Sequence, residues 1–381
     1  MKTELYDVIV TDASQRVSLE LTRALGQKGL RVLIVEKESC TETAISCRSR
    51  YAAGFERVPG YSSDKFLGLC EKASAVFPVS TNTNIALYDK ALARFPGKFL
   101  LPPFDTFMKA NSKPSAVEVA KELGIPCPGT LALKNGEYQP DAIGGFEFPV
   151  VLKLADDENL SLEPQDRYGV ANSRSEAEKQ WNRLKIHGKD ILVQEYLPGE
   201  GCGWSAIYGR AGGCLAGITH VRLREYPISG GPSSYCMAVR DDVIAGHGKR
   251  ILDHLKWTGP AMVEFKKDSK GQPRFLEINP RYWGSLPLAR SAGMNMPYIH
   301  YLALTGNGEL PDCSYREGAR IKFRGMDLMA GLQEMRKSSA KAGYAFRFIC
   351  DFMDPRISDG IFSIEDPLPG IAYVWKNLFG R

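Results

Sequence analysis

The sequence lacks the short motifs of several enzyme classes. No G-x-G-x-x-G follows the first apolar run, where the chain reads Thr11-Asp12-Ala13-Ser14, so a dinucleotide fingerprint is absent. The P-loop motif G-x-x-x-x-G-K-[ST], the zincin motif H-E-x-x-H and the hydrolase motif G-x-S-x-G are also absent. The 5 histidines are dispersed, and none of them stands out as a catalytic base. These absences argue against dehydrogenase, P-loop, zincin and serine-hydrolase chemistry.

The sequence also lacks the features of an exported or membrane protein. Its 9 cysteines are an odd number with no C-x-x-C pair, which is typical of reduced thiols rather than a disulfide framework. The first residues include Glu4 and Asp7 and form no long apolar core, so we expect no signal peptide. The longest stretch with few charged residues, 286–306, is interrupted by Arg290, so we expect no stable membrane insertion. The chain is therefore expected to be cytoplasmic.

A strong net charge is missing as well. The 49 lysines and arginines exceed the 44 acidic residues by only 5, which is too weak a field for a nucleic-acid partner to be expected. The hydrophobic fraction of 44% and the charged fraction of 24% are ordinary for globular proteins and argue against disorder. At about 150 residues per domain, the 381 residues predict two or three domains.

The first hundred residues alternate between strand and helix patterns. A β-branched run at 6–10 is followed by helical spacing over 14–27 and by a second apolar run at 31–35. Strand, helix and strand with short connections predict a parallel βαβ unit. A further strand at 75–79 ends at Ser80, where open α/β sheets place ligand-binding loops. This part is therefore predicted to be an open parallel α/β domain.

The pattern changes after Pro102-Pro103. A helix is expected to open within 112–118, with Pro114 in its first turn and capping-box spacing from Ser115 to Glu118, and to end before Gly124. A helix with methionine and leucine spacing is predicted in the tail, from about Met326. The other predicted strands lie at 148–154, 191–196, 204–208, 214–221, 261–265 and 274–278, and the other helices at 175–186 and 242–255.

Lys153 is a charged residue in an otherwise apolar strand. Alternation places Val151, Lys153 and Ala155 on one face of that strand. A buried ammonium group is costly unless it is paired, so the residue could belong to an internal salt bridge or could reach water at a sheet edge. The functional alternative is a lysine held over a polyanion.

Two carboxylates and an amide stand out in the next strand pair. Strands at 261–265 and 274–278 flank a glycine-containing turn, so they read as a hairpin in which Glu264 and Glu277 are equidistant from the turn centre. A symmetric hairpin puts them opposite each other, and a period of two puts Asn279 on the face of Glu277. Opposed carboxylates are destabilising without a cation between them, and Mg²⁺ prefers such oxygen ligands. The alternative is a solvent-facing strand side with ordinary charges.

The order of these residues resembles the ATP-grasp superfamily. Lys113, Lys153 and the segment Gln194-Glu195-Tyr196-Leu197 precede Glu264, and Glu277-x-Asn279-x-Arg281 follows. The segment that begins at Glu277 is most similar to the carboxylate-amine ligase and carbamoyl-phosphate-synthetase-like branch. The resemblance covers nearly the whole chain and rests on the set of residues rather than on any one of them.

That resemblance implies an α/β fold in which an open parallel domain precedes a two-lobed, α+β ATP-grasp domain. The N-terminal domain would span 1–105, the first lobe 106–196 and the second lobe, with the metal site, 197–310. Residues 311–381 would form a C-terminal extension packed on the grasp domain.

The resemblance also implies a nucleotide site. Lys113 and Lys153 would contact the phosphates of ATP. Gln194 and Glu195 would read the adenine amino group through a side chain and a backbone carbonyl, and the hinge would continue through Tyr196. The backbone N–H of Leu197 would reach a ring nitrogen. Glu200 would occupy the place of a ribose-binding acid.

The metal and reaction sites follow in the same way. Glu264, Glu277 and Asn279 would hold Mg²⁺, with Mn²⁺ as an alternative ion. Arg281 would hold the transferred phosphoryl group or the acceptor carboxylate and would be catalytic together with Lys153. The implied reaction phosphorylates a substrate carboxylate to an acyl phosphate, which an amine then attacks, releasing ADP and phosphate overall.

Two other functions stay open. An enzyme that only phosphorylates a carboxylate, or a carbamoyl-phosphate-like enzyme, would need no amine for its product. An ATP-binding protein with impaired turnover is suggested by the acidic segment 156–166, since that segment stands where the family commonly has a glycine-rich phosphate loop. The expected partners are a small carboxylate and a small amine, and the sequence leaves open a homodimer.

Overall fold

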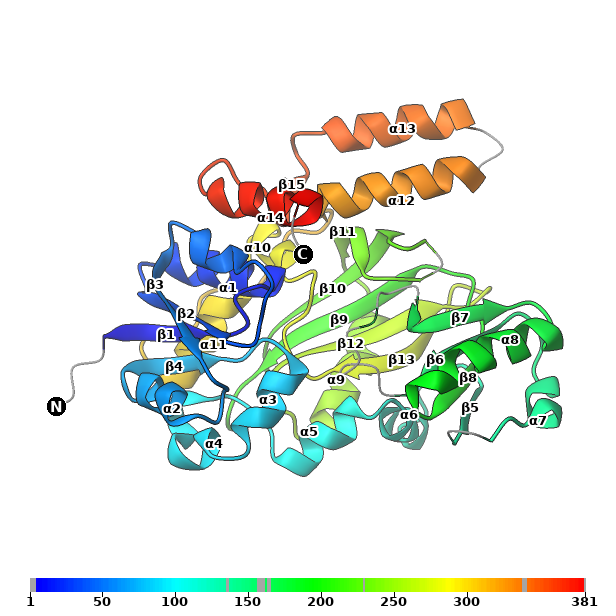
Figure 1. Ribbon diagram of the computed structural model, residues 1–381, viewed down its shortest axis with the longest axis horizontal. Helices are drawn as coiled ribbons and strands as arrows, with labels where there is room; N and C mark the ends of the chain where they lie inside the picture. The colour runs from blue at the N-terminus through cyan, green and yellow to red at the C-terminus, as the bar shows by residue number, and fades with distance from the viewer. Residues whose placement is uncertain are drawn as a thin grey trace.

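The computed structural model describes residues 5–134, 137–155, 162, 166–228, 230–337 and 341–379. Within them the strands form three sheets that follow one another along the chain (Figure 1). The first has the strand order β3-β2-β1-β4, the second β5-β8-β6-β7 and the third β13-β12-β9-β10-β11-β14-β15. The predicted α/β class, with an open parallel N-terminal sheet, is confirmed.

The first sheet is parallel throughout and matches the predicted βαβ start. Its strand order sets β1 beside β4, so the loops that follow these two strands meet at one edge, and the Ser80 N–H donates to the Asp12 carboxylate at 3.1 Å. The elements are β1 (Tyr6–Val10), α1 (Arg16–Gly26), β2 (Val32–Lys37), η1 (Ile45–Arg48), β3 (Ala52–Val58), α2 (Asp64–Glu71), β4 (Ala73–Phe77), α3 (Thr81–Leu87), α4 (Ala91–Arg94) and η2 (Pro96–Lys98).

Two helices, α5 (Phe104–Asn111) and α6 (Lys113–Glu122), connect the first sheet to the second. The predicted capping box at Ser115 is wrong, because the N-cap of α6 is Ser112, whose hydroxyl accepts the Ser115 N–H at 3.4 Å. Pro114 lies in the first helical turn, as predicted, because proline is well tolerated there. The predicted end is right, since Gly124 follows the helix with a φ of +64°.

The second sheet is antiparallel, and helices cover one of its faces. Its elements are β5 (Thr130–Leu133), α7 (Pro140–Gly144), β6 (Val150–Leu154), β7 (Tyr168–Ala171), α8 (Arg174–Leu184), η4 (Lys185–His187) and β8 (Ile191–Glu195). Val150, Leu152 and Leu154 are buried against Trp181 of α8. The opposite face of β6 carries Lys153.

The third sheet is packed with helices on both faces. Its strands are β9 (Gly201–Tyr208), β10 (Cys214–Glu225), β11 (Ser233–Val239), β12 (Gly259–Lys267), β13 (Pro273–Asn279), β14 (Arg320–Lys322) and β15 (Ser358–Asp359). The helices are α9 (Asp242–His254), α10 (Pro287–Ser291), α11 (Met296–Thr305), α12 (Arg324–Lys337), α13 (Lys341–Met353) and α14 (Leu368–Phe379). One core contains residues of α5, α6 and α9, and the other contains residues of α1, α10 and α11.

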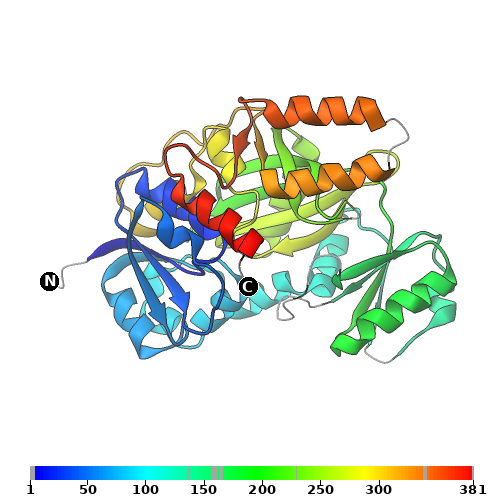
Figure 2. The same ribbon diagram turned by 45° about the horizontal axis from the view of Figure 1, so that its top comes forward.

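The C-terminal part returns to the first sheet's side of the molecule, where α14 contacts η1 (Figure 2). Before α14, the Asp366 carboxylate pairs with the Arg23 guanidinium of α1 at 2.8 Å, and both side chains are only 2% exposed. Asp366 also accepts the Ser49 hydroxyl and the Arg50 N–H, while Arg23 donates to the Ile361 carbonyl. A buried charge network thus joins α1 to the segment that precedes α14.

Across the described ranges, none of the helices combines the length and the apolar character that crossing a bilayer requires.

Candidate nucleotide and acceptor site

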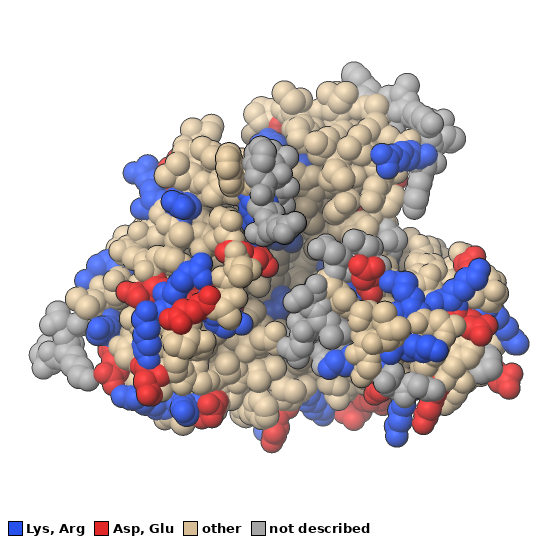
Figure 3. Space-filling view, in the orientation of Figure 1, with Lys and Arg blue, Asp and Glu red and all other residues tan. Residues whose placement is uncertain are grey.

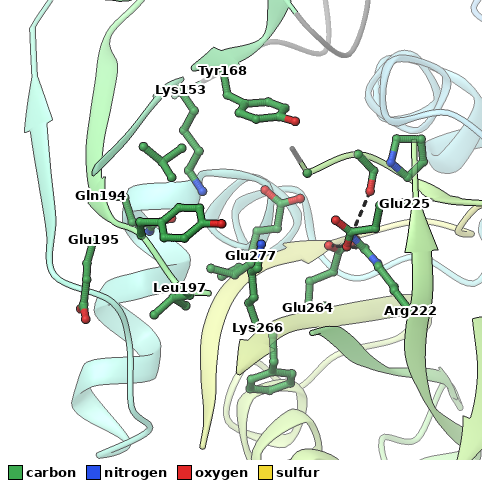
Figure 4. Close-up of a pocket in the computed structure, with 18 residues that line it drawn as sticks. Lys153, Tyr168, Gln194, Glu195, Leu197, Arg222, Glu225, Glu264, Lys266 and Glu277 are labelled. Atoms are coloured by element: carbon green, nitrogen blue, oxygen red, sulfur yellow. Dashed lines mark hydrogen bonds and ion pairs between the residues drawn. The ribbon is translucent and has the colours of Figure 1, made fainter. Parts of the chain in front are cut away.

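A cavity of about 330 Å³ lies between the second and third sheets (Figure 4). Side chains of both sheets line it, so each sheet forms one wall. Seven of the residues that the sequence singled out meet here: Lys153, Gln194, Glu195, Tyr196, Leu197, Glu264 and Glu277. The structure therefore brings one predicted phosphate lysine, the predicted hinge residues and the two predicted metal carboxylates to one place.

Lys153 reaches this cavity because of strand alternation. The neighbours of Lys153 on β6, Leu152 and Leu154, point into the hydrophobic core, so its own side chain points the other way, into the cavity (Figure 4). Cross-strand pairing of Val151 with Gln194 puts both of these side chains on the face of Lys153. Lys113 does not line the cavity, and its ammonium donates to the Leu154 carbonyl at 3.3 Å.

The hinge between the two walls runs from β8 through Leu197. The Gln194 amide donates to the Thr130 hydroxyl at 2.9 Å, which fixes a buried side chain at the cavity's edge. The Glu195 carboxylate accepts the Gly129 N–H at 3.1 Å and points away from the cavity (Figure 4). Only the backbone of Glu195 is thus presented to a ligand, in keeping with the backbone role expected for it.

Glu200 lies apart from these residues. It does not line the cavity, and its carboxylate pairs with the Lys267 ammonium at 3.3 Å. The sequence places Glu200 near the hinge, but the pairing turns it toward the end of β12. The ribose role expected for Glu200 has no support in this geometry.

Glu264 and Glu277 face each other across β12 and β13, as predicted, but the strand pairing that brings them together differs from the predicted one. The hairpin is not symmetric: Phe265 pairs with Phe275, and a β-bulge at Leu276 restores the pairing of Glu264 with Glu277. A bulge inserts one extra residue on one strand and re-aims the side chains there. Leu276 and Glu277 consequently both line the cavity, while Phe275 stays in the core.

The Glu264 carboxylate is already engaged by protein donors. The Asn279 amide donates to one oxygen at 2.9 Å, and the Arg222 guanidinium pairs with the other at 2.6 Å (Figure 4). Arg222 also pairs with Glu225 at 3.3 Å. Burial acts to lower the pKa of Arg222, but the charges of Glu264 and Glu225 outweigh burial and raise that pKa above its usual value.

The oxygen donors fit a magnesium ion that is also held by phosphates and water. The described residues contain no cluster of three or more histidine, cysteine or acidic side chains suited to a metal. Two opposed carboxylates with a neighbouring amide are nevertheless a suitable set, because Mg²⁺ keeps several non-protein ligands. No protein donor to the Glu277 carboxylate occurs among the described residues, so that carboxylate is available to a cation.

Sequence reasoning missed four charged or polar residues of this cavity: Tyr168, Arg222, Glu225 and Lys266. Arg222 precedes Gly230 and Gly231 in the sequence, and these two glycines also line the cavity. The available signal was alternation, since Arg222 lies between Val221 and Leu223 in a long strand.

A second, larger cavity of about 700 Å³ adjoins the first and extends toward the parallel sheet. Asn279 and Arg281 line it, and the Arg281 guanidinium donates to the Thr81 hydroxyl at 3.2 Å. Arg222 and Glu264 line both cavities, so the two spaces meet at that ion pair. Figure 3 shows the molecule hollowed in this region, with basic side chains in its depth.

The acidic segment 156–166 lies outside the described residues except for Leu162 and Asp166, and Asp166 pairs with Arg183 at 3.6 Å. The histidines give no catalytic base in either cavity. His220 and His300 line neither, and burial lowers the pKa of both to about 3, so they are neutral at physiological pH.

Known proteins resemble the chain in sequence. Residues 187–323 match a family described as ATP-grasp in the biosynthetic pathway with Ter operon. The large chain of carbamoyl phosphate synthase from Pyrococcus furiosus is 23% identical over 227 residues, which cover 56% of this chain. The match spans only 21% of the length of that curated protein.

Solved structures share the fold. N5-carboxyaminoimidazole synthetase from Staphylococcus aureus, complexed with ADP, superposes with a TM-score of 0.62 at 15% identity, covering 81% of this chain and 79% of its own. Biotin carboxylase from Campylobacter jejuni, in a β,γ-ATP complex, superposes with a TM-score of 0.65 at 16% identity, covering 83% and 74%. The resemblance that the motifs indicated is thereby confirmed at the level of the fold.

Proposed function

We propose that this chain, an ATP-grasp protein by its fold and its family match, is an ATP-dependent ligase that joins a small carboxylate to a small amine. The observation that carries the proposal is the meeting of two cavities at Glu264 and Arg222. One cavity has the phosphate lysine and the hinge, and the other has Arg281. A phosphate group that leaves a nucleotide in the first cavity would cross to an acceptor in the second.

The nucleotide would lie in the first cavity with its base at the hinge. The backbone of Glu195 and Leu197 offers the donor and acceptor groups that an adenine edge needs, while Val151 contributes apolar surface. The Lys153 ammonium would lie at the phosphates, where its positive charge offsets theirs. Arg222 would meet the terminal phosphate at the boundary between the cavities.

Glu264, Glu277 and Asn279 would hold a Mg²⁺ ion at that boundary. When bound, the ion would neutralise charge on the transferred phosphoryl group and orient it. Mn²⁺ has the same preference for oxygen ligands and is the alternative. Because Glu264 is paired with Arg222 in this structure, Arg222 would have to share that carboxylate or release it.

The acceptor would lie in the second cavity with its carboxylate at Arg281. An oxygen of that carboxylate attacks the γ-phosphorus in line, the bond to the β-phosphate oxygen breaks, and ADP leaves with that electron pair. The amine then adds to the acyl carbon, loses a proton, and displaces phosphate. Positioning and charge supply most of the catalysis in such transfers, which suits a site without a catalytic histidine.

The proposal is tested by incubating the full chain with Mg-ATP and a matrix of carboxylates and amines, measuring phosphate release and identifying products by mass spectrometry. A ligase gives ADP, phosphate and an amide only when both substrates are present. Release with a carboxylate alone would indicate the carboxylate-phosphorylating alternative. AMP and pyrophosphate as products would contradict the mechanism.

Replacing Lys153 with alanine is expected to raise the KM for ATP by about tenfold to a hundredfold, as loss of one charge-assisted contact to phosphate predicts. The measurement is the initial rate of phosphate release against ATP concentration. Lys179→Ala is the matched control, since Lys179 is exposed on α8, the helix that covers the other face of the same sheet. An unchanged KM for ATP in Lys153→Ala would remove Lys153 from the site.

A second candidate is an ATP-binding protein with impaired turnover. The observation that favours it is the engagement of Glu264 by both Arg222 and Asn279, which a metal ion would have to compete with. Such a protein would bind Mg-ADP, as measured by calorimetry, yet would release no phosphate with any substrate pair. Detection of an amide product from the purified chain would exclude it.

A further inference from the structure

Arg16 is a cation that lines the second cavity and has no oxygen acceptor among the described residues. It begins α1, and its guanidinium lies 4.2 Å from the centre of the Phe323 ring, while one of its N–H groups contacts the Met326 sulfur at 2.9 Å. In the part of the chain that the structure describes, no carboxylate forms an ion pair with it. An aromatic face and a thioether hold the side chain in place but leave its charge uncompensated.

The acidic residues that line the same cavity are all engaged by other donors. Asp12 accepts the Ser80 N–H at 3.1 Å and the Thr83 hydroxyl at 2.8 Å. Glu36 accepts the backbone N–H groups of Ser14 and Lys37 at 3.0 and 2.9 Å. Glu42 pairs with Lys376. Glu264 pairs with Arg222. None of these acids therefore neutralises Arg16.

Gly284 leaves room for the Arg16 guanidinium. A Cβ atom at Gly284 would lie 2.9 Å from Nη2 of Arg16, closer than side-chain carbons are found to other atoms. Gly284 belongs to the segment that follows Arg281 and also lines the cavity. The absence of a side chain at this position thus permits the observed place of Arg16.

An uncompensated guanidinium in a partly enclosed site favours an anionic ligand. Burial lowers the pKa of Arg16 below its usual value, although arginine remains charged at physiological pH. A planar guanidinium can bind a carboxylate or a phosphate group through two parallel hydrogen bonds. Such a group would supply the charge that the protein itself does not supply.

Arg16 and Arg281 belong to different walls of the cavity. Arg281 is turned to Thr81 at the start of α3, whereas Arg16 lies against Phe323 and against Met326 of α12. Helix α3 and helix α12 are well separated in both ribbon views (Figures 1 and 2). Because both side chains line the same cavity, one acceptor that carries two anionic groups can engage both guanidinium groups.

We propose that Arg16 binds an anionic group of the acceptor, a carboxylate or a phosphate, other than the carboxylate that is phosphorylated. This inference rests on the proposed function, because it takes the second cavity as the acceptor's place. It specifies the substrate class: the acceptor carries at least two anionic groups. Arg16 would then determine which acceptors bind, without taking part in the transfer of the phosphoryl group.

The test measures direct binding of two probes, succinate and glycerol phosphate, to the full chain by calorimetry at millimolar concentrations. Succinamide serves as the neutral comparison. Wild type is expected to bind at least one of the anionic probes and not succinamide, and the two probes distinguish a carboxylate from a phosphate at Arg16. Arg16→Gln should weaken the binding about tenfold, as loss of one charge-assisted interaction predicts.

Two further variants separate a local effect from a general one. Gly284→Ala should also weaken the binding of the anionic probe, because the added methyl group displaces the Arg16 guanidinium. Gly284 does not have a positive φ, so alanine fits the backbone conformation at this position. Arg356→Gln removes an equal charge from an exposed pair with Asp354 and should bind the probe as wild type does. Thermal unfolding of each variant verifies that it is folded.

Binding of Mg-ADP, measured on the same samples, tests the proposed function separately from this inference. If Arg16→Gln binds the probes as tightly as wild type, or if wild type binds neither probe, the inference is wrong even when phosphate release is found. If binding of the probes depends on Arg16 but no nucleotide binds, Arg16 is confirmed as an anion-binding residue and the ligase proposal is wrong.

Discussion

Replacing Glu277 with alanine is expected to reduce Mg-ATP-dependent phosphate release by about a hundredfold to a thousandfold, the usual cost of losing one group that stabilises transition-state charge. Glu277 faces Glu264 across the hairpin and lines the first cavity. Glu264 is shared with Arg222 and Asn279, so Glu277 is the carboxylate best able to hold a cation. Its removal would weaken metal binding, and the phosphates would then lose the positive charge that the metal ion supplies.

The measurement is the rate of phosphate release at saturating ATP, repeated over a range of Mg²⁺ and Mn²⁺ concentrations. A metal role predicts that Glu277→Asp retains part of the activity and needs more metal ion than wild type does. Glu118→Ala is the control, since Glu118 is exposed on α6 and pairs only with Lys121. A Glu277→Ala variant with the wild-type rate and metal dependence would refute the assignment.

Replacing Asp366 with alanine is expected to lower the free energy of unfolding by about 3–5 kcal/mol, the range found when one partner of a buried ion pair is removed. The reason is the Arg23 guanidinium, which is 2% exposed and would be left without its carboxylate. The Ser49 hydroxyl and the Arg50 N–H would lose their acceptor in the same change. Urea unfolding followed by circular dichroism measures the loss.

The double variant Arg23→Met with Asp366→Leu should recover much of that stability, because it leaves no buried charge behind. Glu118→Ala provides the exposed comparison, since the Glu118 side chain is 65% exposed and its partner Lys121 is 52% exposed. That change is expected to leave the urea midpoint unchanged. A midpoint for Asp366→Ala equal to that of wild type would mean that the buried network contributes nothing to stability.

The sequence predicted those parts of the site that depend on local periodicity. Strand alternation alone put Lys153 on the face opposite the core, and this holds because β6 is a regular strand with Leu152 and Leu154 buried. The pairing of Glu264 with Glu277 was also predicted, although the symmetric hairpin assumed for it is wrong. A one-residue bulge at Leu276 produces the pairing, and nothing in the local pattern marks that bulge.

The parts that could not be predicted depend on contacts between distant segments. Arg222 reaches the site because β10 runs along β9, which in turn pairs with β12, and strand order is not readable from periodicity. The edge strand β3 was missed because it contains Gly54 and is only half-buried, so its hydrophobic pattern is weak. The pairing of Asp366 with Arg23 of α1 joins residues 343 positions apart, and no local pattern predicts such a contact.

The pair formed by Arg23 and Asp366 also has a consequence for how the chain is made. Synthesis proceeds from the N-terminus, so Arg23 leaves the ribosome 343 residues before its carboxylate does. Until Asp366 is synthesised, the N-terminal part either folds with the Arg23 guanidinium unpaired or does not complete its folding. Completion of the N-terminal part is thus expected to be a late event in biogenesis, and nascent chains that stop before Asp366 should be sensitive to proteases.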